Sequence, residues 1–137
     1  MKINTALVLS ALFCSSLSVS AETVTGSAFS VDPPFPFENI APFYKADQKK
    51  PERSTFIIEN QVFLSNDLGE RQAVVTINNS AASLRMLSGR QLMAVFANGD
   101  KHFPQIKNVK ILAGESVSFV FNFGIHRFPI MFISTEN

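Results

Sequence analysis

The sequence predicts an all-β fold, an antiparallel β-sandwich of about seven strands. Three observations lead to this prediction. From Ser54 onward, short apolar and β-branched runs alternate with turn-forming residues roughly every 8–12 residues. The 137 residues are 46% hydrophobic and 17% charged, which is too apolar for a disordered chain and enough for one domain. No long segment shows the period of an amphipathic helix.

Residues 1–21 predict a secretory signal peptide. A basic start at Lys2 precedes an apolar run over residues 6–14, and small residues lead to a cleavage site after Ala21. Nine or ten apolar helical residues span roughly 15 Å, about half of a bilayer core, so a membrane anchor is disfavoured. Phe13 stands before Cys14 where a lipid-modification site needs a small residue. We therefore expect export to the periplasm or beyond the cell.

Cleavage after Ala21 changes the composition of the chain. Removal of 21 residues from 137 leaves 116, without Lys2 and without Cys14, the single cysteine. Basic and acidic side chains then balance, which argues against nucleic acid as a partner. A mature chain without cysteine depends on core packing for stability, and we expect no membrane span in it.

The mature chain divides into an N-terminal arm, residues 22–53, and a sandwich, residues 54–137. The arm begins with one possible strand over residues 22–31, followed by four prolines within residues 32–44. Proline removes backbone donors and fixes φ, so this stretch is expected to be extended. It carries the aromatic residues Phe35, Phe37, Phe43 and Tyr44. Two interpretations stay open: the rings cover an open end of the sandwich, which is favoured, or they bind a partner.

The sandwich is expected to begin with a hairpin. Residues 56–64 form its first strand, residues 65–70 have turn chemistry, and residues 72–78 form the return strand. Alternation in the first strand predicts a single core-facing row, interrupted by Asn60; its members are Phe56, Ile58, Val62 and Leu64.

A second hairpin is expected around Asn98-Gly99, which favours a type I′ turn because both central residues then need positive φ. Its strands are residues 91–97 and 101–107, and Pro104 marks the latter as an edge. Residues 83–87 are expected to form a short strand, and one helical turn within residues 82–87 is the alternative.

Three further strands complete the sandwich, over residues 109–112, 116–123 and 130–133. In the second of these, a strict alternation predicts a core row made of Val117, Phe119, Phe121 and Phe123. The last strand is apolar on both faces. It is therefore either central in its sheet, which is favoured, or an edge that offers Ile130 and Phe132 to another chain.

The C-terminal part resembles a known class of domains. Residues 73–80 end a strand in Asn-Asn-Ser, and residues 109–121 hold a Leu-Ala-Gly-Glu turn followed by an aromatic strand. Together with residues 95–100 they resemble immunoglobulin-like domains of bacterial exported proteins over roughly residues 55–133. The resemblance implies an immunoglobulin-like topology and carries no function by itself. In size and layout, the chain is also similar to accessory proteins that assist cytolysin export and to periplasmic chaperones of surface fibres.

Chemistry-bearing residues are sparse. His102 and His126 are far apart in sequence, and the spacing of Asp100 and His102 is explained by a turn, so we expect no metal. No nucleophile elbow or phosphate-binding loop is present, and the carboxylates are scattered. We therefore expect no enzymatic activity and no cofactor.

Two functional hypotheses follow from these observations. In the first, the chain is an exported, non-enzymatic accessory protein that assists the secretion or stability of a co-exported client, such as a cytolysin. Its partner-binding residues would come from the arm and the last strand, namely Phe35, Phe37, Phe43, Tyr44, Ile130 and Phe132. In the alternative, it is a structural or adhesive subunit of a cell-surface assembly. The sequence leaves the client and the oligomeric state open.

Overall fold

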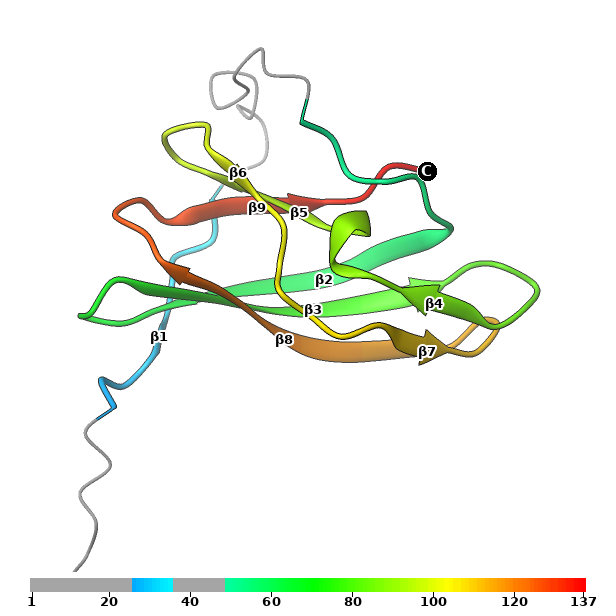
Figure 1. Cartoon of the computed structure of the whole chain (residues 1–137). Coiled ribbons are helices and arrows are strands. Elements are labelled where there is room, and N and C mark those ends of the chain that lie inside the picture. The colour runs from blue at the N-terminus through cyan, green and yellow to red at the C-terminus, as the bar shows by residue number, and fades with distance from the viewer. Residues whose placement is uncertain (1–25, 36–48) are drawn as a thin grey trace, which may run out of the picture.

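The computed structural model describes residues 26–35 and 49–137, and the signal peptide predicted over residues 1–21 lies outside them. The fold is all-β, as predicted, with two layers of antiparallel strands (Figure 1). Its elements are β1 (Ser30–Val31), β2 (Phe56–Ser65), β3 (Glu70–Asn79), β4 (Arg85–Leu87), the 3₁₀ turn η3 (Gly89–Gln91), β5 (Met93–Phe96), β6 (Lys101–His102), β7 (Val109–Ile111), β8 (Ser116–Ile125) and β9 (Ile130–Ser134).

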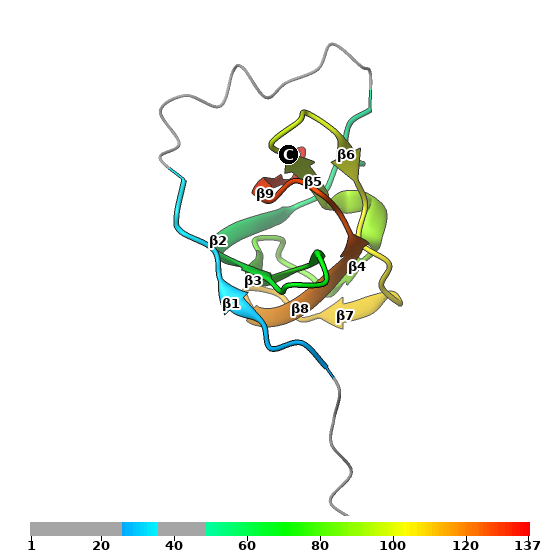
Figure 2. The ribbon, with the colours of Figure 1, turned by 90° about the vertical axis from the view of Figure 1, so that its left-hand side faces the viewer.

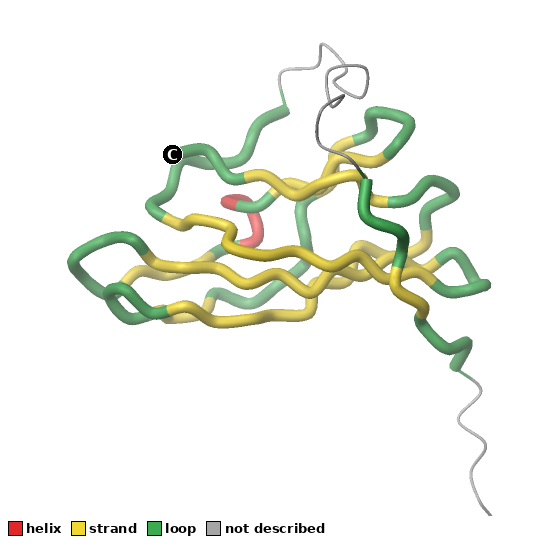
Figure 3. The backbone as a smooth tube through the Cα atoms, turned by 180° about the vertical axis from the view of Figure 1, so that it is seen from behind, coloured by secondary structure: helices red, strands yellow, loops and turns green. Residues whose placement is uncertain are grey.

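The first layer is a four-stranded sheet in the order β1-β2-β3-β8. Within this sheet, β3 lies between β2, its hairpin partner, and β8. Buried residues alternate along β3 with half-buried ones, so one face of this sheet meets the core and the other meets solvent. β1 adds two residues at one edge of the sheet. Figure 3, which views the molecule from behind, shows the arm passing across this end of the sheet.

The second layer is a three-stranded sheet in the order β6-β5-β9. Figure 2, which looks along the strands, shows β5 and β9 lying above β2, β3 and β8. A separate pair, β4 with β7, completes the structure at one side. The observed layers are consistent with a sandwich, while the immunoglobulin-like topology stays a prediction.

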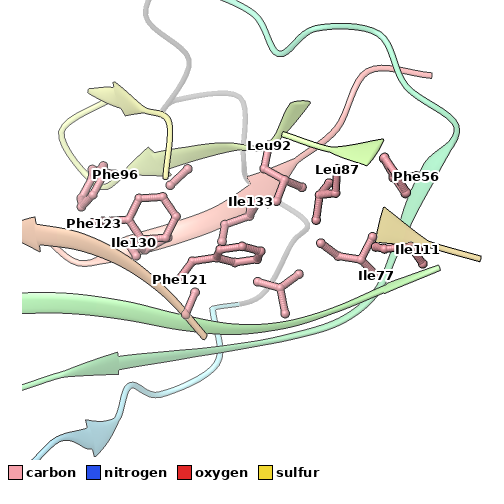
Figure 4. Packing of buried hydrophobic residues seen from close by; sticks show 13 residues of the cluster. Phe56, Ile77, Leu87, Leu92, Phe96, Ile111, Phe121, Phe123, Ile130 and Ile133 are labelled. Carbon is pink, nitrogen blue, oxygen red and sulfur yellow. The ribbon is translucent and has the colours of Figure 1, made fainter. Parts of the chain in front are cut away.

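The main core lies between the layers (Figure 4). Alternate residues of β3, β5 and β8 build it, together with Ile130 and Ile133 of β9 and with Phe56, Leu87, Leu92 and Ile111. Its largest fully buried side chains include Phe96 and Phe121. The predicted core row of β8 is confirmed: Phe121 and Phe123 are buried in this core, and the half-buried Val117 and Phe119 pack against it. Burial of such aromatic side chains is the main source of stability in a chain of this size.

A smaller apolar cluster lies on the opposite face of the second layer. Met93 and Val95 belong to it, whereas Ala94 and Phe96 of the same strand belong to the main core. Met131 and Phe132 of β9 join them. β5 and β9 are thus buried on both faces, which explains why their sequences are continuously apolar.

One buried amide ties three segments together. The Asn79 side chain is fully buried at the end of β3, and its Nδ2 donates hydrogen bonds of 2.9–3.0 Å to the carbonyl oxygens of Ser83, Ile111 and Leu112. Its Oδ1 accepts a bond from the Ala81 N–H. The Asn-Asn-Ser motif therefore does more than form a turn, because its second residue satisfies carbonyls that burial would otherwise leave unpaired.

The predicted facing of β2 is wrong in its second half. Ile58 lies opposite Ile77 and Asn60 opposite Thr76, so Glu59 is the extra residue of a β-bulge. The bulge moves Gln61 and Phe63 to the core face, which places Val62 and Leu64 on the outer face. Asn60 is therefore no interruption of a core row, because the strand changes its facing just before it.

Of two further local predictions, one needs correction. The hairpin at Asn98-Gly99 is confirmed, but its turn is not type I′, because only Gly99 has positive φ (82°). The Gly99 N–H bonds to Phe96 O and the Phe96 N–H bonds to Asp100 O, as in a three-residue loop with glycine in the left-handed region. The short strand expected over residues 83–87 is observed as β4, and a 3₁₀ turn follows at η3 rather than within residues 82–87.

The strand predicted over residues 101–107 is an edge strand among the described residues, as expected, but β6 ends at His102, before Pro104. The central position favoured for the last strand is wrong: within the described chain, β9 pairs with β5 alone. Its two apolar faces contact the main core and the smaller cluster, so burial on both faces did not require a neighbour on both edges.

Candidate partner-binding groove

β2 has an outer edge that the described part of the N-terminal arm, residues 26–35 and 49–53, covers only in part. Ser30 and Val31 pair with Ser65 and Leu64, and the Asp32 N–H donates a 2.9 Å bond to Phe63 O. Pro33 and Pro34 follow and have no N–H to offer, so the pairing stops there. Two prolines thus set the point at which the arm leaves the sheet.

Beyond this point, no strand among the described residues pairs with the outer edge of β2. The carbonyl of Phe63 points toward the arm. Because backbone groups alternate in direction along a strand, the N–H and C=O of Gln61, two residues away, point to the same side. The bulge at Glu59 follows and distorts the rest of the edge. An unpaired edge is a template for a further strand, and a bulge limits how far that strand can extend.

The edge of β9 faces this open edge from the second layer. The Ile133 N–H donates a 2.9 Å hydrogen bond to Gln61 Oε1, so a side chain of β2 satisfies a backbone donor of β9. Further along, the Ser54 N–H bonds to Glu136 O at 2.8 Å. These contacts hold the two edges together at one end.

At the other end the layers enclose a groove of about 420 Å³. We call it the β2–β9 groove; it is lined by Val31, Asp32, Pro34, Phe35, Ile58, Glu59, Asn60, Gln61, Val62, Phe63 and Met131. Apolar side chains dominate the lining, and the arm, β2 and β9 all contribute. A concave, mostly apolar site with a few polar groups is typical of ligand and peptide binding.

The groove carries negative charge at one side. Asp32 Oδ1 accepts a hydrogen bond from the Ser65 hydroxyl, while Asp32 Oδ2 is buried and has no hydrogen-bond partner in the described chain. Glu59, the bulge residue, is exposed at the same groove. Among the described residues, the lining includes these two carboxylates and no basic side chain.

The six residues predicted to bind a partner have different locations. Phe35 lines the groove and is 36% exposed. Ile130 and Phe132 are buried, 4% and 5% exposed, so their side chains are not presented at the surface. Phe37, Phe43 and Tyr44 lie outside the described residues. Sequence reasoning did not select Met131 or the groove residues of β2, because the edge contact between β2 and β9 is a tertiary feature.

A second cluster joins the two histidines. The ring centroids of His102 and His126 lie 4.4 Å apart, and those of His126 and Phe96 lie 4.2 Å apart. His126 Nε2 is 3.1 Å from Phe123 O. His126 lies half-buried in the loop after β8, and its ring packs against Phe96 and His102 of the β5–β6 hairpin. In residues 26–35 and 49–137, no group of three potential metal ligands is close enough to hold an ion.

The pKa of His102 lies below its usual value of 6.5. Burial is the largest cause, followed by repulsion from His126 and then from Lys49, whereas Asp100 acts in the opposite direction. Each effect that lowers the pKa disfavours the charged imidazolium. The cluster is therefore most stable with His102 neutral.

Comparisons with protein-family models, curated proteins and solved structures gave no match. No helix in the described part of the chain is long and apolar enough to cross a membrane. Functional assignment therefore depends on the geometry of the chain itself.

Proposed function

We propose that this chain is an exported, non-enzymatic accessory protein whose β2–β9 groove holds an extended segment of another exported protein. The observation that carries the proposal is the open edge of β2 beside an apolar groove. A segment added to this edge would gain backbone hydrogen bonds, and alternate side chains would enter the groove. The signal-like N-terminus supports an exported partner.

The arm supports this binding mode. β1 is a short antiparallel strand on the same edge, so the edge accepts an added strand in this register. The prolines after Asp32 end the pairing of residues 30–32 with β2, and no described strand pairs with the edge from Val62 to the bulge at Glu59. Ile130 and Phe132 would contribute by fixing the position of β9 rather than by direct contact, because both are buried.

Site-specific photo-cross-linking in the native host tests the proposal. A photoreactive phenylalanine analogue at Asn60, in the groove, is compared with the same analogue at Val120, an outward-facing position 63% exposed on β8. We expect one exported protein to be cross-linked from Asn60 and not from Val120. Deletion of this chain should then lower the exported amount of that protein.

Two results would contradict the proposal. Equal cross-linking from both positions would show unspecific contact. Cross-linking of Asn60 to a second copy of the chain would support instead the alternative of a surface-assembly subunit, because an open edge also permits self-association.

A further inference from the structure

The charge of the β2–β9 groove restricts the kind of segment it accepts. Most of the lining is apolar, and its charged members, Asp32 and Glu59, are both acidic. A neutral apolar segment would leave both carboxylates facing apolar surface. Desolvation of a carboxylate without a compensating donor is costly, so such a segment would bind poorly.

The state of Asp32 strengthens this argument. One oxygen accepts the Ser65 hydroxyl bond, while Oδ2 is buried with no hydrogen-bond partner in the described chain. Buried polar atoms are usually satisfied, and an exception calls for an explanation. A cationic donor is the strongest available partner for this oxygen, because the resulting hydrogen bond is charge-assisted.

Asp32 also stands at the right place for recognition. Within residues 26–35 it is the last one whose backbone is seen to bond to β2, and the proline pair follows directly. A segment continuing along the β2 edge would therefore begin beside its carboxylate.

We infer that the segment held in the groove carries a lysine or arginine, and that Asp32 is the residue that selects it. This inference rests on the proposed function and adds to it the chemistry of the partner. Glu59 strengthens the attraction from the exposed side of the groove, where solvent screens it more strongly.

A peptide panel tests this inference on the mature chain. The probes are eight-residue peptides of alternating valine and threonine, with one lysine moved through all positions, and a matched set with norleucine in place of lysine. Norleucine keeps the aliphatic stem and removes the charge. At one position we expect the lysine peptide to bind at least about tenfold more tightly than its norleucine match.

Two variants locate the effect. Asp32→Asn keeps the shape and the Ser65 contact, and it should bring the two peptides to nearly equal affinity. Glu59→Gln should reduce the preference for lysine only about two- to threefold, because that carboxylate is exposed. Melting curves of both variants check that the fold is retained.

The outcomes separate the inference from the proposed function. Equal binding of lysine and norleucine peptides to the unmodified chain would overturn the inference and leave the groove as a binding site. A lysine preference that persists in Asp32→Asn would also overturn it. If no peptide of either set binds, the proposed function itself fails.

Discussion

β2 and β8 lie on either side of β3, and both are ten-residue strands paired to it in antiparallel register. In β8 the alternation is regular from Val117 to Phe121, and its bulge comes only near the end, where the register shifts opposite Arg71 and Gln72. In β2 the bulge lies in the middle, at Glu59. Of the two neighbours of β3, β8 is therefore regular over most of its length, whereas the facing of β2 changes midway.

The difference in regularity matches a difference in environment. The outer face of β8 is largely polar, and Thr76 shares a 2.9 Å hydroxyl contact with Ser118 across the strands. β2 borders the groove, and its bulge places Glu59 there. Bulges commonly redirect side chains near functional sites, so the irregular strand is the better candidate for binding.

Single-residue deletions test this comparison with the largest expected effect. Deletion of Val120 from the regular part of β8 should prevent folding, because every following side chain moves to the opposite face. Deletion of Glu59 should be tolerated, since Phe56, Ile58, Gln61 and Phe63 would all keep their facing in a regular ladder. Circular dichroism and thermal melting measure both variants.

The assignment of Glu59 as the extra residue of the β2 bulge is refuted if its deletion unfolds the protein as completely as deletion of Val120. We expect instead a change in unfolding free energy within about 1 kcal/mol for the Glu59 deletion.

Truncation of the β8 core row should have the next largest effect. Phe121 is 1% exposed and lies opposite Ala73, so Phe121→Ala should lower the unfolding free energy by about 3–5 kcal/mol. Chemical denaturation measures this loss. A negligible change would mean that the facing of β8 is misassigned, and Val120→Ala on the outer face is the matched control.

The corrected facing of β2 makes a smaller prediction. Phe63 packs against the core while being only half-buried, so Phe63→Ala should cost about 2 kcal/mol. Val62→Ala on the outer face should cost under about 0.5 kcal/mol. Urea titrations of the two variants, side by side, distinguish the facings. A larger loss of unfolding free energy for Val62→Ala than for Phe63→Ala would instead support the facing predicted from the sequence, with Val62 toward the core.

The smallest effect concerns pH and the end of β8. Because the pKa of His102 is lowered on folding, the unfolded chain binds protons more readily. The contribution of neutral His102 to the unfolding free energy is therefore fully present above pH 6.5 and declines as the pH falls below this value. The loss should be small, since the His102 ring is partly solvated.

Hydrogen exchange measured at pH 7 and pH 5.5 gives the site-resolved result. Amides near the histidine pair, at Gly124–His126, should lose protection at the lower pH, while those in the β2–β3 hairpin should not. His102→Gln should remove the difference. Uniform loss along both strands would assign the pH dependence to other groups.

The sequence by itself determined the all-β class, the two hairpins and the core row of β8, because alternation and turn chemistry are local properties. Tertiary structure decided the facing of β2, where one extra residue shifts the pattern without a distinctive local signal. It also decided that His102 meets His126 and that β9 is an edge beside β2, since these contacts join residues distant in the chain. The β2–β9 groove belongs to this second group: its lining comes from three segments, and only packing of the two layers brings them together.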